Sequence, residues 1–397
     1  MLNKPIAFSL VAAAVAAACT GSAYAAEPLE PYAHKGKVIQ RLTAFDNPEA
    51  AIFSADGNYV FISNAAELGM PDKGFHFVRG AGYISKLAVQ PDGTLQMVDE
   101  KLLSGLTAPL GMAVSTVATQ KFPKGTIFVG EAWAPLAEAD GSAVSDPQSI
   151  DPKIIAFSPE GQILGAIKMG EGSAAHKASG VVATLNNALA FDKAGNLYSI
   201  DTGIGGGTFK PAIATNGGGA YMFPVESLDA LADGREAAVY YIATPNSGPD
   251  GIEVGPDGII HFNTVGVVAG LKDPAEGGMY RARIEDFKSG NLPKPFVQGL
   301  GALDGLTFAG TARLDTEIKN TGSVVVTPFW SGEPYQLTYD QDIKFAGPAD
   351  IATYKMDDGS YLLVVPELAP TSPNNKDNPV TVIRLPADFD RFTSAQQ

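Results

Sequence analysis

The chain of 397 residues contains a single cysteine and only four histidines. One cysteine cannot form an internal disulfide or a thiolate zinc cluster, so the sequence excludes both. No histidine lies in the His-Glu-x-x-His spacing of a zinc hydrolase, and the Gly-x-Ser-x-Gly turn of a serine hydrolase does not occur. Catalysis by thiol, by histidine-bound zinc or by an activated serine is therefore disfavoured.

Basic residues are also scarce: 28 Lys and Arg stand against 43 Asp and Glu, which gives a formal net charge of −15. Nucleic acids and anionic membranes bind to positive patches, and this excess of acid argues against both as partners. After the first 26 residues, no apolar stretch approaches the roughly 20 residues that a membrane-spanning helix needs. We expect a small-molecule substrate, no nucleic acid and no membrane span.

The first 26 residues have the pattern of an export signal. Lys4 supplies the positive start, an apolar run follows, and Ala23-Tyr24-Ala25 offers a small-x-small cleavage site. We therefore expect residues 1–26 to be a secretory signal peptide and residues 27–397 to form one mature domain, periplasmic or secreted. The alternative is a lipoprotein attached through Cys19, although the residues before Cys19 lack the usual leucine.

An apolar strand pattern restarts six times at the same phase along the chain. Its opening residues are Glu49, Leu110, Asn187, Asp250, Asp304 and Asp350. The restarts are 46 to 77 residues apart, about the length of a four-stranded blade with its loops. This spacing predicts an all-β fold, a six-bladed β-propeller with a central channel. We expect the opening residues, here called the lead residues, to point toward the channel axis.

Local signals support the strand interpretation. Turns that contain glycine are expected to introduce second strands at Gly57, Gly195 and Gly258. Residues 380–385 are expected to pair with residues 36–43, which would close the ring and remove exposed sheet edges. Helical patterns are confined to residues 225–232 and 284–288, so the sequence predicts an all-β chain.

These segments resemble the six-bladed family of regucalcin (senescence marker protein), gluconolactonase and luciferin-regenerating enzyme. The resemblance rests on Pro48-Glu49, on Asn187-Ala-Leu-Ala-Phe-Asp192 and on Pro249-Asp250-Gly251-Ile252. It covers nearly all of the expected mature chain in the right order. The Glu–Asn–Asp order at the strand openings is its more specific part.

The resemblance implies a divalent-metal site and a reaction. Glu49, Asn187 and Asp250 match the family's metal ligands, and Asp250 also matches the proposed general base. The implied activity is hydrolysis of a lactone or related ester, in which the metal polarises the carbonyl and Asp250 activates water. Oxygen ligands favour one Ca²⁺ ion, with Zn²⁺ or Mn²⁺ as alternatives.

One position departs from the family pattern. Leu110 stands where the family lactonases usually have a substrate-binding Asn, which puts sugar lactones in doubt and suits a more apolar ring near Leu110 and Met112. Further candidates for substrate binding are polar residues at strand ends and in the first long loop, namely Asn64, His76, Arg79, Asp201 and Asp304. For these residues, and for the metal ligands, the alternative is a structural role in turns and loop packing. No family role is assigned to Asp304 or Asp350.

Two other functions remain compatible with the sequence. Long connections at residues 65–81, 131–152, 203–218 and 366–379 are expected to gather on one face. A non-catalytic periplasmic propeller could use this face to bind a small ligand or a protein. Alternatively, the cation could only pin the channel, and lyase or cyclase chemistry on the same scaffold also stays open.

Overall fold

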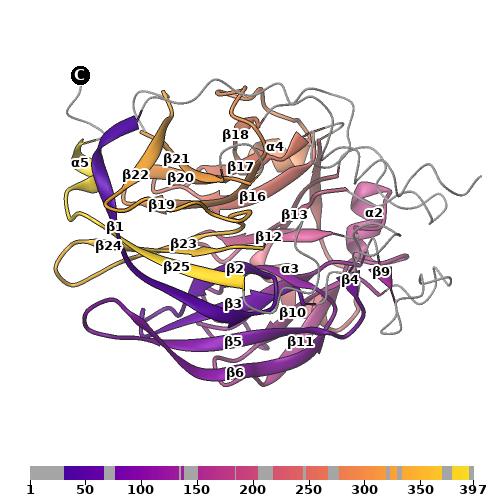
Figure 1. The fold of residues 1–397 in the computed structure, drawn as a ribbon. Coiled ribbons are helices and arrows are strands. Elements are labelled where there is room, and N and C mark those ends of the chain that lie inside the picture. The colour runs from indigo at the N-terminus through magenta and orange to yellow at the C-terminus, as the bar shows by residue number, and fades with distance from the viewer. Residues whose placement is uncertain are drawn as a thin grey trace, which may run out of the picture.

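The structure is a computed structural model, and it describes residues 31–66, 77–133, 136–137, 151–183, 185–203, 218–244, 247–266, 277–318, 322–328, 333–368 and 378–392. It is a set of twisted β-sheets arranged about a common axis, in a propeller-like manner (Figure 1). Among the described residues, no helix is long and apolar enough to cross a membrane.

The first two sheets have four strands each. The first sheet contains β2 (Pro48–Phe53), β3 (Tyr59–Asn64), β5 (Gly82–Val89) and β6 (Leu95–Leu106). The second contains β7 (Pro109–Val114), β8 (Ile127–Glu131), β10 (Lys153–Phe157) and β11 (Ile163–Lys168). Between them the short strands β4 (Phe77–Val78) and β9 (Leu136–Ala137) pair in parallel, so connections of the first and second sheets meet.

The third and fourth sheets continue the same antiparallel order. The third contains β12 (Asn186–Phe191), β13 (Leu197–Asp201), β14 (Gly219–Phe223) and β15 (Tyr240–Ala243). The fourth contains β16 (Pro249–Val254), β17 (Ile260–Thr264) and β18 (Met279–Ala282). The glycines expected in the first hairpin turns, Gly57, Gly195 and Gly258, have positive φ angles of 71°, 91° and 80°. Glycine adopts this conformation at no steric cost, which is why it marks the turns.

The rest of the described chain forms one eight-stranded sheet. Its order is β19 (Leu303–Ala309), β20 (Ala312–Glu317), β21 (Ser323–Thr327), β22 (Tyr335–Tyr339), β1 (Pro31–Phe45), β25 (Asn378–Leu385), β24 (Tyr361–Pro366) and β23 (Ala352–Lys355). The prediction of six separate blades is therefore wrong: the structure describes four separate blades and one fused sheet.

The fusion is made by β1, which lies between β22 and β25 (Figure 1). Its first part pairs in parallel with β22, as in Lys35 opposite Thr338. Its second part pairs antiparallel with β25, from Lys37 opposite Arg384 to Leu42 opposite Val380, so the predicted pairing of the two terminal segments is confirmed. The two edge strands, β19 and β23, lie side by side, and the sheet is a nearly closed barrel.

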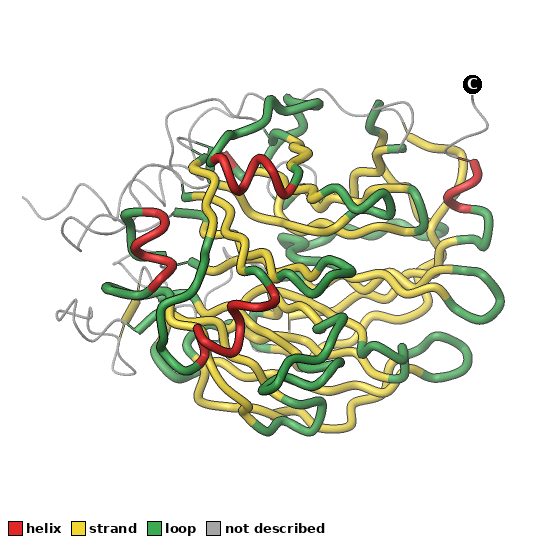
Figure 2. Tube along the Cα trace, turned by 180° about the vertical axis from the view of Figure 1, so that it is seen from behind, coloured by secondary structure: helices red, strands yellow, loops and turns green. Residues whose placement is uncertain are grey.

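Helices are short and lie outside the strand layers (Figure 2). Helix α3 (Val225–Ala232) and helix α4 (Ile284–Ser289) occupy the two segments predicted from the sequence. The sequence analysis missed α2 (Ala174–Ser179) and α5 (Phe389–Phe392). The start of α2 was readable, because Ser173 caps it by accepting a hydrogen bond from the backbone N–H of His176.

The hydrophobic core lies between neighbouring sheets and not at one centre. Phe61 and Met112 pack between the first and second sheets, whereas Phe128 and Tyr221 pack between the second and third. Burial of such a side chain contributes about 1.5–3 kcal/mol. This packing holds the six first strands, β2, β7, β12, β16, β19 and β23, in a closed ring in which each contacts the next.

Candidate functional site

The lead residues all open the first strands of this ring. Glu49, Leu110, Asn187, Asp250 and Asp304 are the second residues of β2, β7, β12, β16 and β19, and Asp350 comes just before β23. In the first five of these strands, the pairing register shifts at the lead residue. A bulge of this kind bends a strand and redirects one side chain. Repeated around the ring, it turns the lead side chains toward a shared space.

Backbone contacts bring the openings of neighbouring strands close together. A Cβ atom on Gly251 would lie 2.4 Å from the carbonyl oxygen of Asp304, and one on Gly305 would lie 2.4 Å from the Cα atom of Asp350. Contacts this short leave no room for a side chain. Glycine directly after the lead residue is therefore what allows adjacent carboxylates to approach.

Four carboxyl groups share the resulting space. Glu49, Asp250 and Asp304 are 2%, 4% and 5% exposed, and Asp350 is partly buried. Burial, followed by the charges of Asp304, Asp350 and Asp250, raises the pKa of Glu49 well above its ordinary value. Burial and the charges of Asp304 and Asp350 likewise raise the pKa of Asp250. These effects indicate that the four groups lie near one another.

Burial raises the pKa of Asp304 to about 7, and burial with the charge of Asp304 raises that of Asp350. Glu253, three residues after Asp250 on β16, has its pKa raised to about 7 by burial and adds to the negative charge near Asp350. Among the described residues, none of the four carboxyl groups forms an ion pair with Lys, Arg or His. The axis therefore concentrates negative charge that has no cationic partner in this part of the chain.

This environment predicts how stability depends on pH. A carboxyl group with a raised folded-state pKa stabilises the fold fully below its unfolded pKa, and that contribution is lost as pH rises through the folded pKa. For Asp304 the window runs from 3.8 to about 7, which corresponds to a contribution on the order of 4 kcal/mol. We expect Asp304→Asn to raise the free energy of unfolding of the chelator-treated protein most at about pH 7.5, and by roughly a third as much at about pH 5, where the unfolded-state carboxyl has only begun to gain its advantage.

The measurement is urea unfolding at both pH values, with Asp357→Asn, in an exposed turn, as the control. His261 acts in the opposite direction, because burial lowers its pKa to about 2 and only the unfolded chain takes up its proton below about pH 6.5. Comparison of variant with wild type cancels this contribution, since both contain His261. An equal effect of Asp304→Asn at both pH values would contradict the expected charge repulsion.

The donor chemistry of the site fits a hard cation. Among the described residues, Glu49 Oε2 and Asp304 Oδ1 are buried oxygen atoms without a hydrogen-bond partner. Glu49, Asn187 and Asp250 offer carboxylate and amide oxygens, which hard divalent cations such as Ca²⁺ prefer. The described residues contain no group of three or more His, Cys, Asp or Glu side chains already placed to hold a metal ion. The predicted ligand set consists of two carboxylates and one amide and is therefore not a group of this kind. The three metal-ligand assignments remain predictions.

Asn187 lies directly against Asp250. Its Nδ2 donates to Asp250 Oδ1 and, at 3.2 Å, to Thr202 Oγ1. Half a turn of the amide exchanges its oxygen and nitrogen, so the same side chain can support Asp250 or offer an oxygen to a cation. The neighbouring Asn186 instead donates to the backbone oxygen of Glu131, so Asn187 is the one of the two that contacts Asp250.

The one apolar lead residue belongs to a separate hydrophobic cluster. Leu110 is 3% exposed and packs in a cluster that contains Phe77, Trp133 and Leu185. Met112 is not part of this cluster, because it packs between the first and second sheets. Among the described lead residues, Leu110 therefore joins the ring to an apolar cluster.

Two of the candidate substrate-binding residues have structural contacts. Asn64 is fully buried, accepts a hydrogen bond from the backbone N–H of Asp46 and donates to Ser85 Oγ. Asp201 is also fully buried and accepts from the backbone N–H of Leu185. These are the contacts of the structural alternative, and the binding role of both residues remains a prediction.

The same contact recurs in five repeats, which the sequence analysis did not notice. An acid or amide at the end of the second strand accepts a hydrogen bond from a backbone N–H just before the first strand. The pairs are Asn64 with Asp46, Glu131 with Thr107, Asp201 with Leu185, Glu317 with Ala302, and Glu367 with Ala346. The signal was present, since an Asn, Asp or Glu stands at or next to the end of β3, β8, β13, β20 and β24.

The remaining substrate-binding candidates are differently placed. His76 lies outside the described residues. Arg79 is partly buried, with its guanidinium carbon 5.6 Å from the centre of the Trp133 ring, and thus borders the cluster of Leu110. Asp304 is the only one of the five candidates that the structure places among the axial carboxylates.

Comparison with known proteins supports the fold. No protein-family model matches the chain, and no curated protein matches its sequence. A provisionally named gluconolactonase of known structure is 13% identical, with a TM-score of 0.51 over 90% of this chain and 94% of its own. A Dyadobacter fermentans protein of unknown function is 10% identical, with a TM-score of 0.52 over 88% of this chain and 99% of its own.

A provisionally named oxidoreductase (glucose dehydrogenase) of Thermus thermophilus is 13% identical, with a TM-score of 0.50 over 88% of this chain and 99% of its own. The structural neighbours thus include a provisionally named member of the gluconolactonase group that the sequence resembles. Because an oxidoreductase shares the architecture at the same identity, the likeness shows the fold and leaves the reaction to the site.

Proposed function

We propose that the chain is an exported, cation-dependent hydrolase of a lactone or related ester, with its site at the axial ends of the first strands. The observation that carries this proposal is the meeting of four buried or partly buried carboxyl groups with no cationic partner among the described residues. Buried carboxylates are normally paired or bound to a metal, because an isolated buried charge costs several kcal/mol. Glu49, Asn187 and Asp250 would hold one divalent cation, with Ca²⁺ as the first choice and Zn²⁺ or Mn²⁺ as alternatives.

A bound cation would polarise the carbonyl group of the substrate. Asp250 takes a proton from the attacking water, whose oxygen then bonds to the carbonyl carbon. The acyl–oxygen bond breaks, and the proton passes to the leaving alkoxide. In the cation-free site, burial and the charges of Asp304 and Asp350 raise the pKa of Asp250. Asn187, bonded to Asp250, fixes the direction of its carboxylate.

The apolar cluster narrows the substrate class. A substrate whose carbonyl lies at the carboxylates has Leu110 as its neighbour on one side, and Leu110 is continuous with Trp133 and Phe77. Such a surface suits an alkyl or ring carbon better than a row of hydroxyl groups, which it would leave without hydrogen bonds. We therefore propose an alkyl-substituted lactone or ester in preference to a sugar lactone.

The proposal also covers the export signal, the mature domain and the number of blades. Residues 1–26 would direct export, and residues 27–397 would form one domain, periplasmic or secreted, with attachment through Cys19 as the alternative. Each half of the eight-stranded sheet has four strands, so we propose that it acts as two blades, which together with the four separate blades would give six about the channel. This view explains why each of the six first strands supplies one lead residue.

Cation binding is the direct test. The chelator-treated protein is expected to take up about one divalent ion per chain. At a Ca²⁺ concentration one hundred times Kd, its free energy of unfolding should rise by about 2.7 kcal/mol. Glu49→Gln and Asp250→Asn should each lose most of this gain, and Asp357→Asn should keep it. Metal analysis of the purified protein and thermal unfolding with and without chelator measure both effects.

Absence of a bound ion, together with no stability change on addition of Ca²⁺, Mn²⁺ or Zn²⁺, would refute the cation-dependent hydrolase. A stability gain without turnover of any lactone or ester would instead favour a cation that only pins the channel.

A further inference from the structure

The bulges that redirect the lead residues also release backbone groups from the sheets. Gly251 and Gly305, which follow the lead residues Asp250 and Asp304, have no partner in the ladder with the second strand, whereas Ala50, which follows Glu49, lies opposite Ser63. A buried N–H left without a partner costs about 1–3 kcal/mol. In three repeats, a buried side chain of the second strand accepts this hydrogen bond: Ser63 from Ala50, Asn263 from Gly251, and Thr316 from Gly305. We call Ser63, Asn263 and Thr316 the belt residues.

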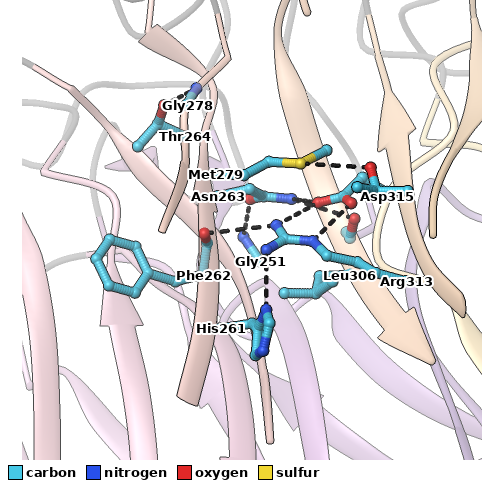
Figure 3. A network of polar contacts seen from close by, with 12 residues as sticks. Gly251, His261, Phe262, Asn263, Thr264, Gly278, Met279, Leu306, Arg313 and Asp315 are labelled. Atoms are coloured by element: carbon cyan, nitrogen blue, oxygen red, sulfur yellow. Dashed lines mark hydrogen bonds and ion pairs between the residues drawn. The ribbon is translucent and has the colours of Figure 1, made fainter. Parts of the chain in front are cut away.

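Asn263 joins the fourth sheet to the eight-stranded sheet. Its Oδ1 accepts the N–H of Gly251 at 2.7 Å (Figure 3). Its Nδ2 donates to the carbonyl oxygen of Gly305 at 3.3 Å. Gly251 follows Asp250, and Gly305 follows Asp304. One fully buried amide thus fixes the backbone beside two of the axial carboxylates.

Thr316 continues this connection around the ring. Its hydroxyl accepts the N–H of Gly305 at 2.8 Å and donates to the carbonyl oxygen of Ala349 at 2.9 Å, just before Asp350. The N–H of Asp350 then donates to the carbonyl oxygen of Glu49 at 2.8 Å. These hydrogen bonds, together with the peptide bonds between neighbouring residues, therefore connect the backbone at Asp250 with that at Asp304, Asp350 and Glu49.

An internal ion pair holds the Asn263 amide in place. Asp315 Oδ1 accepts from Asn263 Nδ2 at 2.9 Å, and Arg313 binds both oxygens of Asp315 at 2.7 and 2.8 Å (Figure 3). Arg313 and Asp315 are 2% and 0% exposed. Because the Asp315 carboxylate, paired with Arg313, offers only acceptor atoms, it directs the NH₂ group of Asn263 toward itself and the Oδ1 atom toward Gly251.

We propose that the belt residues are positioning residues, which set the spacing of the four axial carboxyl groups and thereby their affinity for a cation. Each of them is hydrogen-bonded to a backbone group next to a carboxylate, so they act through the carboxylates and not on a substrate. The role in cation binding rests on the proposed function, whereas the role in spacing the carboxyl groups does not. Loss of residues that orient metal ligands typically lowers metal affinity about 10- to 100-fold.

Thr316→Val tests the proposal, because it keeps the shape of the side chain and removes both belt hydrogen bonds. Thr316→Ser keeps the hydroxyl and should restore wild-type behaviour. The matched control is Thr126→Val, which removes a buried hydroxyl bonded to the carbonyl oxygen of Pro123, at the opposite end of β8 from Glu131. Ser63→Ala removes the hydrogen bonds of Ser63 Oγ to the N–H and the carbonyl oxygen of Ala50 and replaces Thr316→Val should that variant not fold.

Two measurements separate the possible outcomes. Calorimetric titration with Ca²⁺ alone should give a Kd raised about 10- to 100-fold in Thr316→Val, with wild-type values in Thr316→Ser and Thr126→Val. Crystal structures without cation should show Asp304 and Asp350 displaced relative to Glu49 in Thr316→Val only. If the wild type binds no cation, the proposed function is wrong. The displacement of Asp304 and Asp350 in Thr316→Val then tests by itself whether the belt residues set the spacing of the carboxyl groups. Unchanged carboxylate positions, or an unchanged Kd beside a lowered Tm, would overturn the proposal.

Discussion

Asp250→Asn is expected to lower kcat for lactone or ester hydrolysis by about 10²- to 10⁴-fold, the usual contribution of a positioned general base. The amide has nearly the shape of the carboxylate and can still contact Asn187, but it cannot accept a proton from water. The loss should persist at saturating Ca²⁺, since the missing group is the base. Glu49→Gln removes only a proposed cation ligand, so part of its activity should return as Ca²⁺ is raised.

The assay compares an alkyl-substituted δ-lactone with glucono-δ-lactone for the wild type, both variants and Asp357→Asn. The cluster around Leu110 leads us to expect the higher kcat/KM for the alkyl lactone. A non-catalytic propeller that binds a ligand or protein through its loops makes a different prediction, namely complex formation without turnover and no effect of Asp250→Asn. Full turnover in Asp250→Asn would remove this residue from the mechanism even if the lactone is a substrate.

The positions of the lead residues could be predicted from the sequence because they depend on local order. Side chains alternate along a strand, so the phase at which each apolar pattern restarts fixes which residue opens the strand. That reasoning placed Asp250 and Asp304 at the openings of their strands, and in the structure they are the second residues of β16 and β19. It did not include the bulges, which redirect these side chains and depend on the pairing with the second strand.

The belt residues and the fused sheet could not be predicted in this way. Asn263 is 42 residues from Gly305 along the chain, and only the packing of one sheet against the next brings them together. Thr316 and Ser63 read as ordinary strand residues for the same reason. The fusion of the last strands depends on β1, whose first residues pair in parallel with β22. The repeated apolar pattern begins after β1, at the first lead residue, so it gives no sign of this pairing.

Asp315→Ala is expected to lower the free energy of unfolding by about 3–5 kcal/mol, because it leaves the buried guanidinium of Arg313 without its charged partner. His261 cannot replace that partner: its Nδ1 lies 3.3 Å from Arg313 Nη1, and burial holds its pKa at about 2, so it is neutral. The control is Asp233→Ala, which breaks two solvent-exposed ion pairs, one with Arg235 at the same two-residue separation and one with Lys121, and should change stability little. Arg313→Met combined with Asp315→Leu should recover much of the loss, since neither charge then remains buried. Urea unfolding of the four proteins measures these effects, and a single variant no less stable than the double variant would show that the ion pair does not hold this part of the ring.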